Sequence, residues 1–197
     1  MPAHGIVAAG HQQTAEAAVS ILKEGGNAFD AVVAALFAAC VTEPVLCSLG
    51  GGGFLLGQTA KGRSGVLDFF VQTPRQNRPE SELDFYPIIA DFGTSQQEFH
   101  IGQGSIATPG MIRGLFAIQR ELGTMPMTEL VAPAIALARE GVALNALQSY
   151  IFSIVAPIYL ASPEARSLFK SPTEKDATLR EGERYQNPET ADVLDVL

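Results

Sequence analysis

The stretch that decides the fold runs from residue 25 to residue 54 and reads GGNAFDAVVAALFAACVTEPVLCSLGGGGF. The glycine pair at its start ends one helix, and Asn27 can cap the next because its side-chain oxygen accepts from orphan N–H groups. Asp30 follows three residues later, where a carboxylate complements the helix dipole, so we expect a structural capping role for it. The helix predicted over residues 27–42 is apolar around its whole circumference and should be covered on most sides.

The glycine run Gly50–Gly53 follows this helix and precedes a predicted strand. Successive glycines can cradle a phosphate, but no Lys-Ser or Lys-Thr pair follows, so nucleotide binding is not indicated. The glycines should instead permit positive φ and close backbone contact where the chain enters a sheet. Strands predicted over residues 54–59 and 66–72, joined by a polar turn, form a hairpin.

The flanking segments are mostly helical. A short strand is predicted over residues 6–9, and an amphipathic helix over residues 14–24 places Ala15, Ala18, Val19 and Leu22 on its apolar face. Residues 73–104 sustain neither period and predict a long irregular loop. Further helices are predicted over residues 109–122, 128–140, 145–160, 162–169 and 189–197. We expect residues 1–197 to form a single incomplete domain, because the chain breaks off inside a helix.

The composition, with 47% hydrophobic and 17% charged residues, is typical of a globular protein with a large core. The net charge of −8 argues against nucleic acid or an anionic membrane as a partner. The longest apolar run, residues 31–41, is about half of the roughly 20 residues that a bilayer requires. Because no hydrophobic leader is visible, we expect a cytoplasmic protein, or a periplasmic or secreted one if a leader has been trimmed.

The spacing of the histidines and cysteines indicates neither a catalytic group nor a metal site. His4, His11 and His100 lack metal-ligand spacing, and His11 is expected to be a loop or capping residue. Cys40 and Cys47 are too few and too isolated for a disulfide framework or a zinc site. Cys40 is expected to be a small core residue, with a reactive thiol as the alternative.

Several motifs occur in one order along the chain. GGNAFDA and LGGGGF are followed by LDF at residues 67–69, IATPG at 106–110 and LGTMP at 122–126. This order resembles the N-terminal part of the large subunit of γ-glutamyltransferases, which are self-cleaving members of the N-terminal-nucleophile hydrolase superfamily. The resemblance implies an α+β fold, the αββα sandwich, of which this chain supplies a helix-rich part and a core β-hairpin.

The resemblance also implies the chemistry. It predicts a self-processing γ-glutamyltransferase or hydrolase that cleaves γ-glutamyl amides such as glutathione, without a metal or organic cofactor. The nucleophile would be the N-terminal threonine of the small subunit, with its own α-amino group as base. No catalytic residue is therefore expected in this chain, and the fragment alone should be inactive. Its partners would be the missing C-terminal part of the large subunit and the threonine-bearing small subunit; without them, exposed apolar faces should make it self-associate.

The same resemblance marks candidate substrate-binding residues. The glycines Gly50, Gly51, Gly52 and Gly53 are expected near the active site. The family carries an arginine directly after Asp-Phe that binds the substrate's α-carboxylate, but Phe70 stands there in this sequence. Either Arg75, Arg78 or an arginine outside this chain supplies the charge instead, or the protein is a divergent amidase or acylase in which Phe70 lines an apolar pocket. A non-catalytic homologue is the remaining alternative.

Overall fold

The structure, a computed structural model, describes residues 5–197. His4 and the first residues, in which the sequence shows no hydrophobic leader, lie outside the described part of the chain. The chain divides into two compact units. The first unit comprises residues up to Thr73 together with Thr108–Glu140 and Pro188–Leu197, and the second comprises Pro74–Ala107 and Gly141–Asn187.

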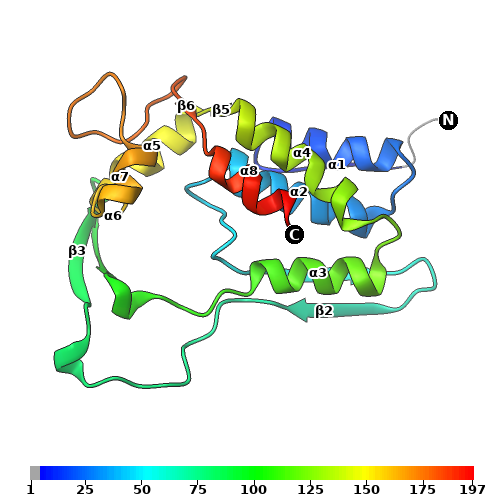
Figure 1. Cartoon of the computed structure of the whole chain (residues 1–197), viewed down its shortest axis with the longest axis horizontal. Coiled ribbons are helices and arrows are strands. Elements are labelled where there is room, and N and C mark those ends of the chain that lie inside the picture. The colour runs from blue at the N-terminus through cyan, green and yellow to red at the C-terminus, as the bar shows by residue number, and fades with distance from the viewer. Residues whose placement is uncertain (1–4) are drawn as a thin grey trace. The chain divides into compact units, whose positions relative to one another are not determined.

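Helices α1 (Gln12–Lys23), α2 (Ala28–Thr42), α4 (Met127–Glu140) and α8 (Pro188–Asp195) gather in the first unit (Figure 1). The predicted apolar helix is confirmed as α2, which Asn27 caps through hydrogen bonds from the N–H groups of Phe29 and Asp30. Phe37 is fully buried on it. Because alanine and valine fill most of α2, neighbouring helices pack against several of its sides, as the sequence predicted.

The buried face of helix α1 shares only Ala18 with the predicted face. The buried residues are Thr14, Ala17, Ala18 and Ile21, whereas Ala15, Val19 and Leu22 are only half-buried. The reason is that Thr14, a polar residue, is satisfied inside: its hydroxyl lies 2.7 Å from the Thr42 hydroxyl and donates to the Glu43 carboxylate at 2.8 Å. The predicted strand over residues 6–9 does not form, and Ile6 is 99% exposed.

The predicted hairpin is confirmed as β1 (Phe54–Gln58) and β2 (Ser64–Asp68), paired antiparallel. β2 ends earlier than predicted: Phe69 still exchanges backbone hydrogen bonds with Gly53, but Gln72 forms a bridge with Thr108 instead. Helix α3 (Met111–Leu122) lies beside β2 (Figure 1). It starts at Met111 rather than at residue 109, but its predicted apolar face is buried at Met111, Leu115 and Ile118, and Gly123 ends it.

The second unit corrects the loop predicted over residues 73–104. Strands β3 (Tyr86–Asp91) and β4 (Gln96–Ile101) form an antiparallel hairpin there. A turn around Gly93, at φ 84°, joins them, and short 3-10 helices η1 (Glu80–Glu82) and η2 (Gln103–Ser105) flank them. The residue pattern did not predict these strands because a proline interrupts the first strand and two adjacent glutamines begin the second.

The remainder of the second unit is helical. Helices α5 (Ala146–Ile154), α6 (Ala156–Tyr159) and α7 (Pro163–Phe169) accompany a short pair, β5 (Val142–Ala143) and β6 (Arg184–Tyr185). The helix predicted over residues 145–160 is interrupted at Val155, since Pro157 has no N–H to continue the helical hydrogen bonds.

Candidate functional site

The glycine run is held between the end of the hairpin and the start of α3. The N–H of Phe69 donates to the carbonyl of Gly53 at 3.0 Å, and the N–H of Gly53 donates back at 3.3 Å. The carbonyl of Gly51 accepts from the N–H groups of Gly110 and Met111, at 3.0 and 2.9 Å. The motifs LGGGGF and LDF and the TPG part of IATPG, residues 108–110, therefore meet at one place in the first unit.

Close backbone packing explains why glycine occupies this junction. A Cβ at Gly52 would lie 2.5 Å from the Phe69 carbonyl oxygen and 2.8 Å from the Val71 nitrogen. A Cβ at Gly110 would overlap the same carbonyl oxygen, and one at Gly114 would lie 2.5 Å from Phe69 Cβ. None of the glycines of the run has positive φ. The expected close contact is thus confirmed at Gly52, and the expected positive φ is wrong.

Phe70 lies at the surface beside the glycine run. Its N–H donates to the Asp68 carboxylate at 2.9 Å, and its ring stacks on Phe54 with centroids 5.4 Å apart and planes 13° from parallel. Phe70 is 50% exposed, whereas the neighbouring Phe69 is buried under Gly114. The geometry leaves the Phe70 ring free to contact a ligand, and that contact stays a prediction.

Arg75 and Arg78 are exposed residues of the second unit, between Pro74 and η1. The hydrogen bonds that fix Phe70 beside the glycine run come from the first unit alone. A role for either arginine in substrate binding stays a prediction.

Asp30 has the structural role that its position predicts, and a longer reach than expected. Its buried carboxylate accepts from the N–H of Asn27 at 2.9 Å, completing a capping box. It also accepts from the Thr124 N–H at 2.9 Å, the Thr124 hydroxyl at 2.6 Å and the Met125 N–H at 3.2 Å. Burial alone would raise the pKa of the Asp30 carboxyl, but these hydrogen bonds together hold the pKa below its ordinary value.

The contacts that Asp30 and Asn27 make with residues far away in the sequence therefore stabilise the fold. The segment LGTMP is tied to the start of α2 by Asp30, and Asn27 donates from its side chain to the Leu122 carbonyl at 2.8 Å. Sequence reasoning missed this contact because the partners lie 94 residues apart. The one signal of this contact in the sequence was the TMP part of the motif LGTMP, residues 124–126.

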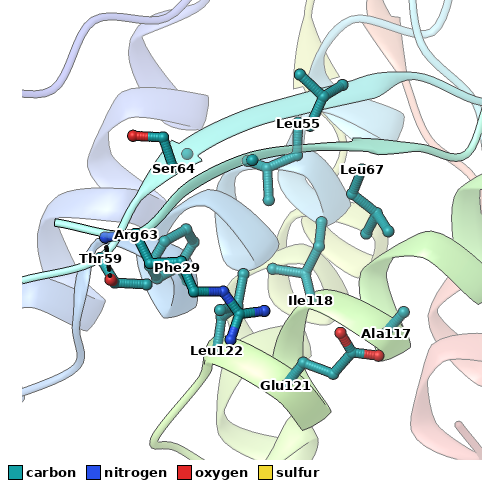
Figure 2. A pocket seen from close by; sticks show the side chains of 13 residues that line it. Phe29, Leu55, Thr59, Arg63, Ser64, Leu67, Ala117, Ile118, Glu121 and Leu122 are labelled. Carbon is teal, nitrogen blue, oxygen red and sulfur yellow. Dashed lines mark hydrogen bonds between the residues drawn. The ribbon is translucent and has the colours of Figure 1, made fainter. Parts of the chain in front are cut away.

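A cavity of about 170 Å³ lies between the hairpin and α3 (Figure 2). Figure 2 shows Leu55 and Leu67 on the strands above Ile118, with the Arg63 side chain reaching toward α3, where Glu121 stands. Its volume is below the ~300 Å³ from which ligand pockets usually start. We assign it to the packing between hairpin and helix rather than to a substrate.

The histidine and cysteine predictions have mixed outcomes. His11 caps α1, as predicted, by accepting from the Gln13 N–H at 3.2 Å. Cys40 is buried, as predicted, but the two cysteines are not isolated: their sulfur atoms lie 3.5 Å apart. Among residues 5–197, no group of three or more His, Cys, Asp or Glu residues is arranged to hold a metal ion. No helix in that same range is both long enough and apolar enough to cross a bilayer.

Comparison with known proteins gives consistent matches. The model of the γ-glutamyltranspeptidase family matches residues 14–197. The glutathione hydrolase proenzyme of Escherichia coli strain K12 is 37% identical over 145 residues, covering 72% of this chain and 23% of that protein. The acylase ACY 1 proenzyme of Pseudomonas sp. strain V22 is 34% identical over 142 residues, covering 70% of this chain and 25% of that protein. The γ-glutamyltranspeptidase of Helicobacter pylori superposes with a TM-score of 0.78 at 26% identity, covering 97% of this chain and 53% of that chain.

These matches establish the class of fold first: it is that of the N-terminal-nucleophile hydrolases, as the motifs predicted. Within that class, the chain belongs to the γ-glutamyltranspeptidase family. It spans about a quarter of the length of the curated relatives it matches.

Proposed function

We propose that this chain is the N-terminal part of the large subunit of a self-processing amide hydrolase or transferase that acts on γ-glutamyl amides such as glutathione. The observation that carries the proposal is the junction at the glycine run, where backbone hydrogen bonds of Gly53 with Phe69 and of Gly51 with Gly110 join three family motifs. A relative whose name gives glutathione hydrolysis, at 37% identity, supports the substrate class.

The reaction would be an acyl transfer. A threonine outside this chain, activated by its own α-amino group, attacks the γ-glutamyl carbonyl and forms an ester that water or an amino acid then cleaves. Backbone N–H groups stabilise the oxyanion. This chain contributes the rigid glycine junction and the Phe70 ring beside it, and no nucleophile.

A second candidate function is an acylase that accepts an acyl group without a charged terminus. The stack of Phe70 on Phe54 favours it, because an exposed aromatic pair binds apolar groups and cannot pair with a carboxylate. The 34% identity to an acylase proenzyme is in keeping with this candidate. In the first candidate, Arg75, Arg78 or an arginine outside the chain binds the substrate carboxylate.

The exposed face of the β1–β2 hairpin fits a chain that is covered by the remainder of its protein. Leu56 and Val66 are cross-strand partners and are 78% and 66% exposed, and Phe54 and Phe70 continue the apolar surface. We propose that the missing part of the large subunit and the small subunit cover this face, and that the chain alone self-associates.

The test uses the full-length precursor. After purification and incubation, its intact mass should resolve into two fragments, the smaller beginning with threonine, and the processed protein should release p-nitroaniline from γ-glutamyl-p-nitroanilide. Cleavage with turnover of an apolar acyl p-nitroanilide instead would establish the acylase. A single uncleaved mass and no turnover of either substrate would indicate a non-catalytic homologue and overturn both candidates.

A further inference from the structure

A tight turn folds Cys47 back onto the last turn of α2. The helix ends at Thr42, and the carbonyl of Glu43 then accepts from the N–H groups of both Leu46 and Cys47, each at 2.9 Å. This turn brings the Cys47 sulfur to 3.5 Å from the Cys40 sulfur. A disulfide has an S–S length of about 2.0 Å, so an approach of roughly 1.5 Å would join the two sulfurs.

The two thiols differ in access and in acidity. Cys40 is 7% exposed on the helix, whereas Cys47 is half-buried in the turn. The contact with Cys40 lowers the pKa of the Cys47 thiol, against the opposing effects of burial and of the Glu43 charge. The same contact, with burial, raises the pKa of Cys40. The thiolate is the nucleophile, and Cys47 is both the more exposed and the more acidic of the two thiols. We therefore expect Cys47 to react with an oxidant first.

We propose that Cys40 and Cys47 form a reversible dithiol–disulfide site, whose oxidant is a small-molecule disulfide. The Cys47 thiolate attacks one sulfur of the oxidant, forms a mixed disulfide and expels a thiolate, which takes up a proton. Cys40 then loses its proton to solvent and attacks the Cys47 sulfur, expelling the second thiolate. Two protein thiols are oxidised to one disulfide, and one small disulfide is reduced to two thiols.

The product would staple the turn of residues 43–47 to the end of α2, immediately before the glycine run begins. The proposal rests on the sulfur contact and on the turn, and it holds whether the protein cleaves γ-glutamyl amides or not. It also does not require the chain to be active.

The experiment treats the reduced full-length protein with 2-hydroxyethyl disulfide, which contains no amide. Both cysteines fall in one tryptic peptide, residues 24–61, because no lysine or arginine lies between Lys23 and Lys61. In the wild type this peptide should lose two hydrogen atoms, resist backbone fragmentation between residues 40 and 47, and regain its mass with dithiothreitol. A peptide that instead keeps the oxidant's thiol as an adduct on Cys47, or that links two protein molecules, would overturn the proposal.

Two variants separate the steps. Cys40→Ala should stop the reaction at the mixed disulfide, so that the peptide retains one 2-mercaptoethanol group on Cys47. Cys47→Ser should leave the buried Cys40 unmodified over the same time. Circular dichroism of both variants checks their folding, and a Cys47→Ser protein modified at Cys40 as fast as the wild type reacts would contradict the assignment of Cys47 as the attacking thiol.

Discussion

The buried carboxylate of Asp30 gives the sharpest stability prediction. One oxygen accepts from the Asn27 N–H and the Thr124 hydroxyl, the other accepts from the Met125 N–H, and the Thr124 N–H is shared between both oxygens at 2.9 and 3.1 Å. In Asp30→Asn, one oxygen becomes an NH₂ group, a donor that faces other donors. If the NH₂ takes the position near the Thr124 hydroxyl, that hydroxyl can turn to accept, but the Asn27 N–H stays unpaired.

The magnitude follows from this count. One unsatisfied buried donor costs about 1–3 kcal/mol, and the loss of charge weakens the remaining bonds, so we expect a loss of about 2–4 kcal/mol. At about 1.4 kcal/mol per factor of ten, local opening should become roughly 30-fold or more as frequent. Hydrogen exchange of the Thr124 and Met125 amides in the full-length protein measures this directly. Asp192→Asn, at a side chain that is 78% exposed, is the matched control and should change exchange little.

The pH dependence has a definite sign. Because the pKa of Asp30 is lower in the folded state than its ordinary 3.8, the folded state binds fewer protons than the unfolded state near that pH. The stabilisation is fully present above pH 3.8 and is lost as the pH falls through the lower folded value. The wild type and Asp30→Asn should therefore converge in opening free energy at acidic pH. Amides of Thr124 and Met125 that exchange equally in both proteins at neutral pH would refute the reasoning.

Three further predictions concern the first unit. Gly114→Ala should lower the free energy of unfolding, measured by urea titration, by about 1–3 kcal/mol because the added Cβ meets Phe69. Gly65→Ala, which has open space around it, is the control and should change that free energy by no more than about 0.5 kcal/mol. Phe70→Arg should raise kcat/KM for γ-glutamyl-p-nitroanilide about 10-fold or more, and an unchanged value would show that the substrate carboxylate is not bound at position 70. Leu56→Lys should reduce self-association of the isolated chain, measured by light scattering, because it places a charge on the exposed apolar face. If the wild-type chain is already a monomer, the exposed face does not cause self-association.

What the sequence predicts well is what neighbouring residues determine. The cap at Asn27 and the apolar run after it specify α2 without reference to the rest of the chain, and the face of α3 follows from its helical spacing. The strand pair over residues 86–101 was missed because Pro87 breaks the local pattern and only pairing across the hairpin stabilises it. The cysteine contact was missed because it depends on a turn at Glu43 that no motif announces.

The candidate site divides in the same way. The resemblance predicted that the glycine run and Phe70 each lie near the active site, and the hydrogen bonds between Gly53 and Phe69 make the two segments neighbours. The burial of Phe69 and the exposure of Phe70 could not be read from two identical adjacent residues. The packing of Gly114 decides between them, because only a residue without a side chain leaves room for the Phe69 ring.

This division of roles makes Phe70 a clean position for testing specificity. Its ring is half exposed and stacks on Phe54, while its backbone is fixed by the Asp68 carboxylate, which an exchange of side chain does not touch. A guanidinium can lie flat on an aromatic face much as the Phe70 ring does, so an arginine fits the same position without entering the core. A change in substrate preference on Phe70→Arg would therefore report the chemistry of the side chain rather than a loss of folding. If the enzyme already binds a γ-glutamyl carboxylate through another arginine, the added charge will change KM little, and that outcome would direct the search to Arg75 and Arg78.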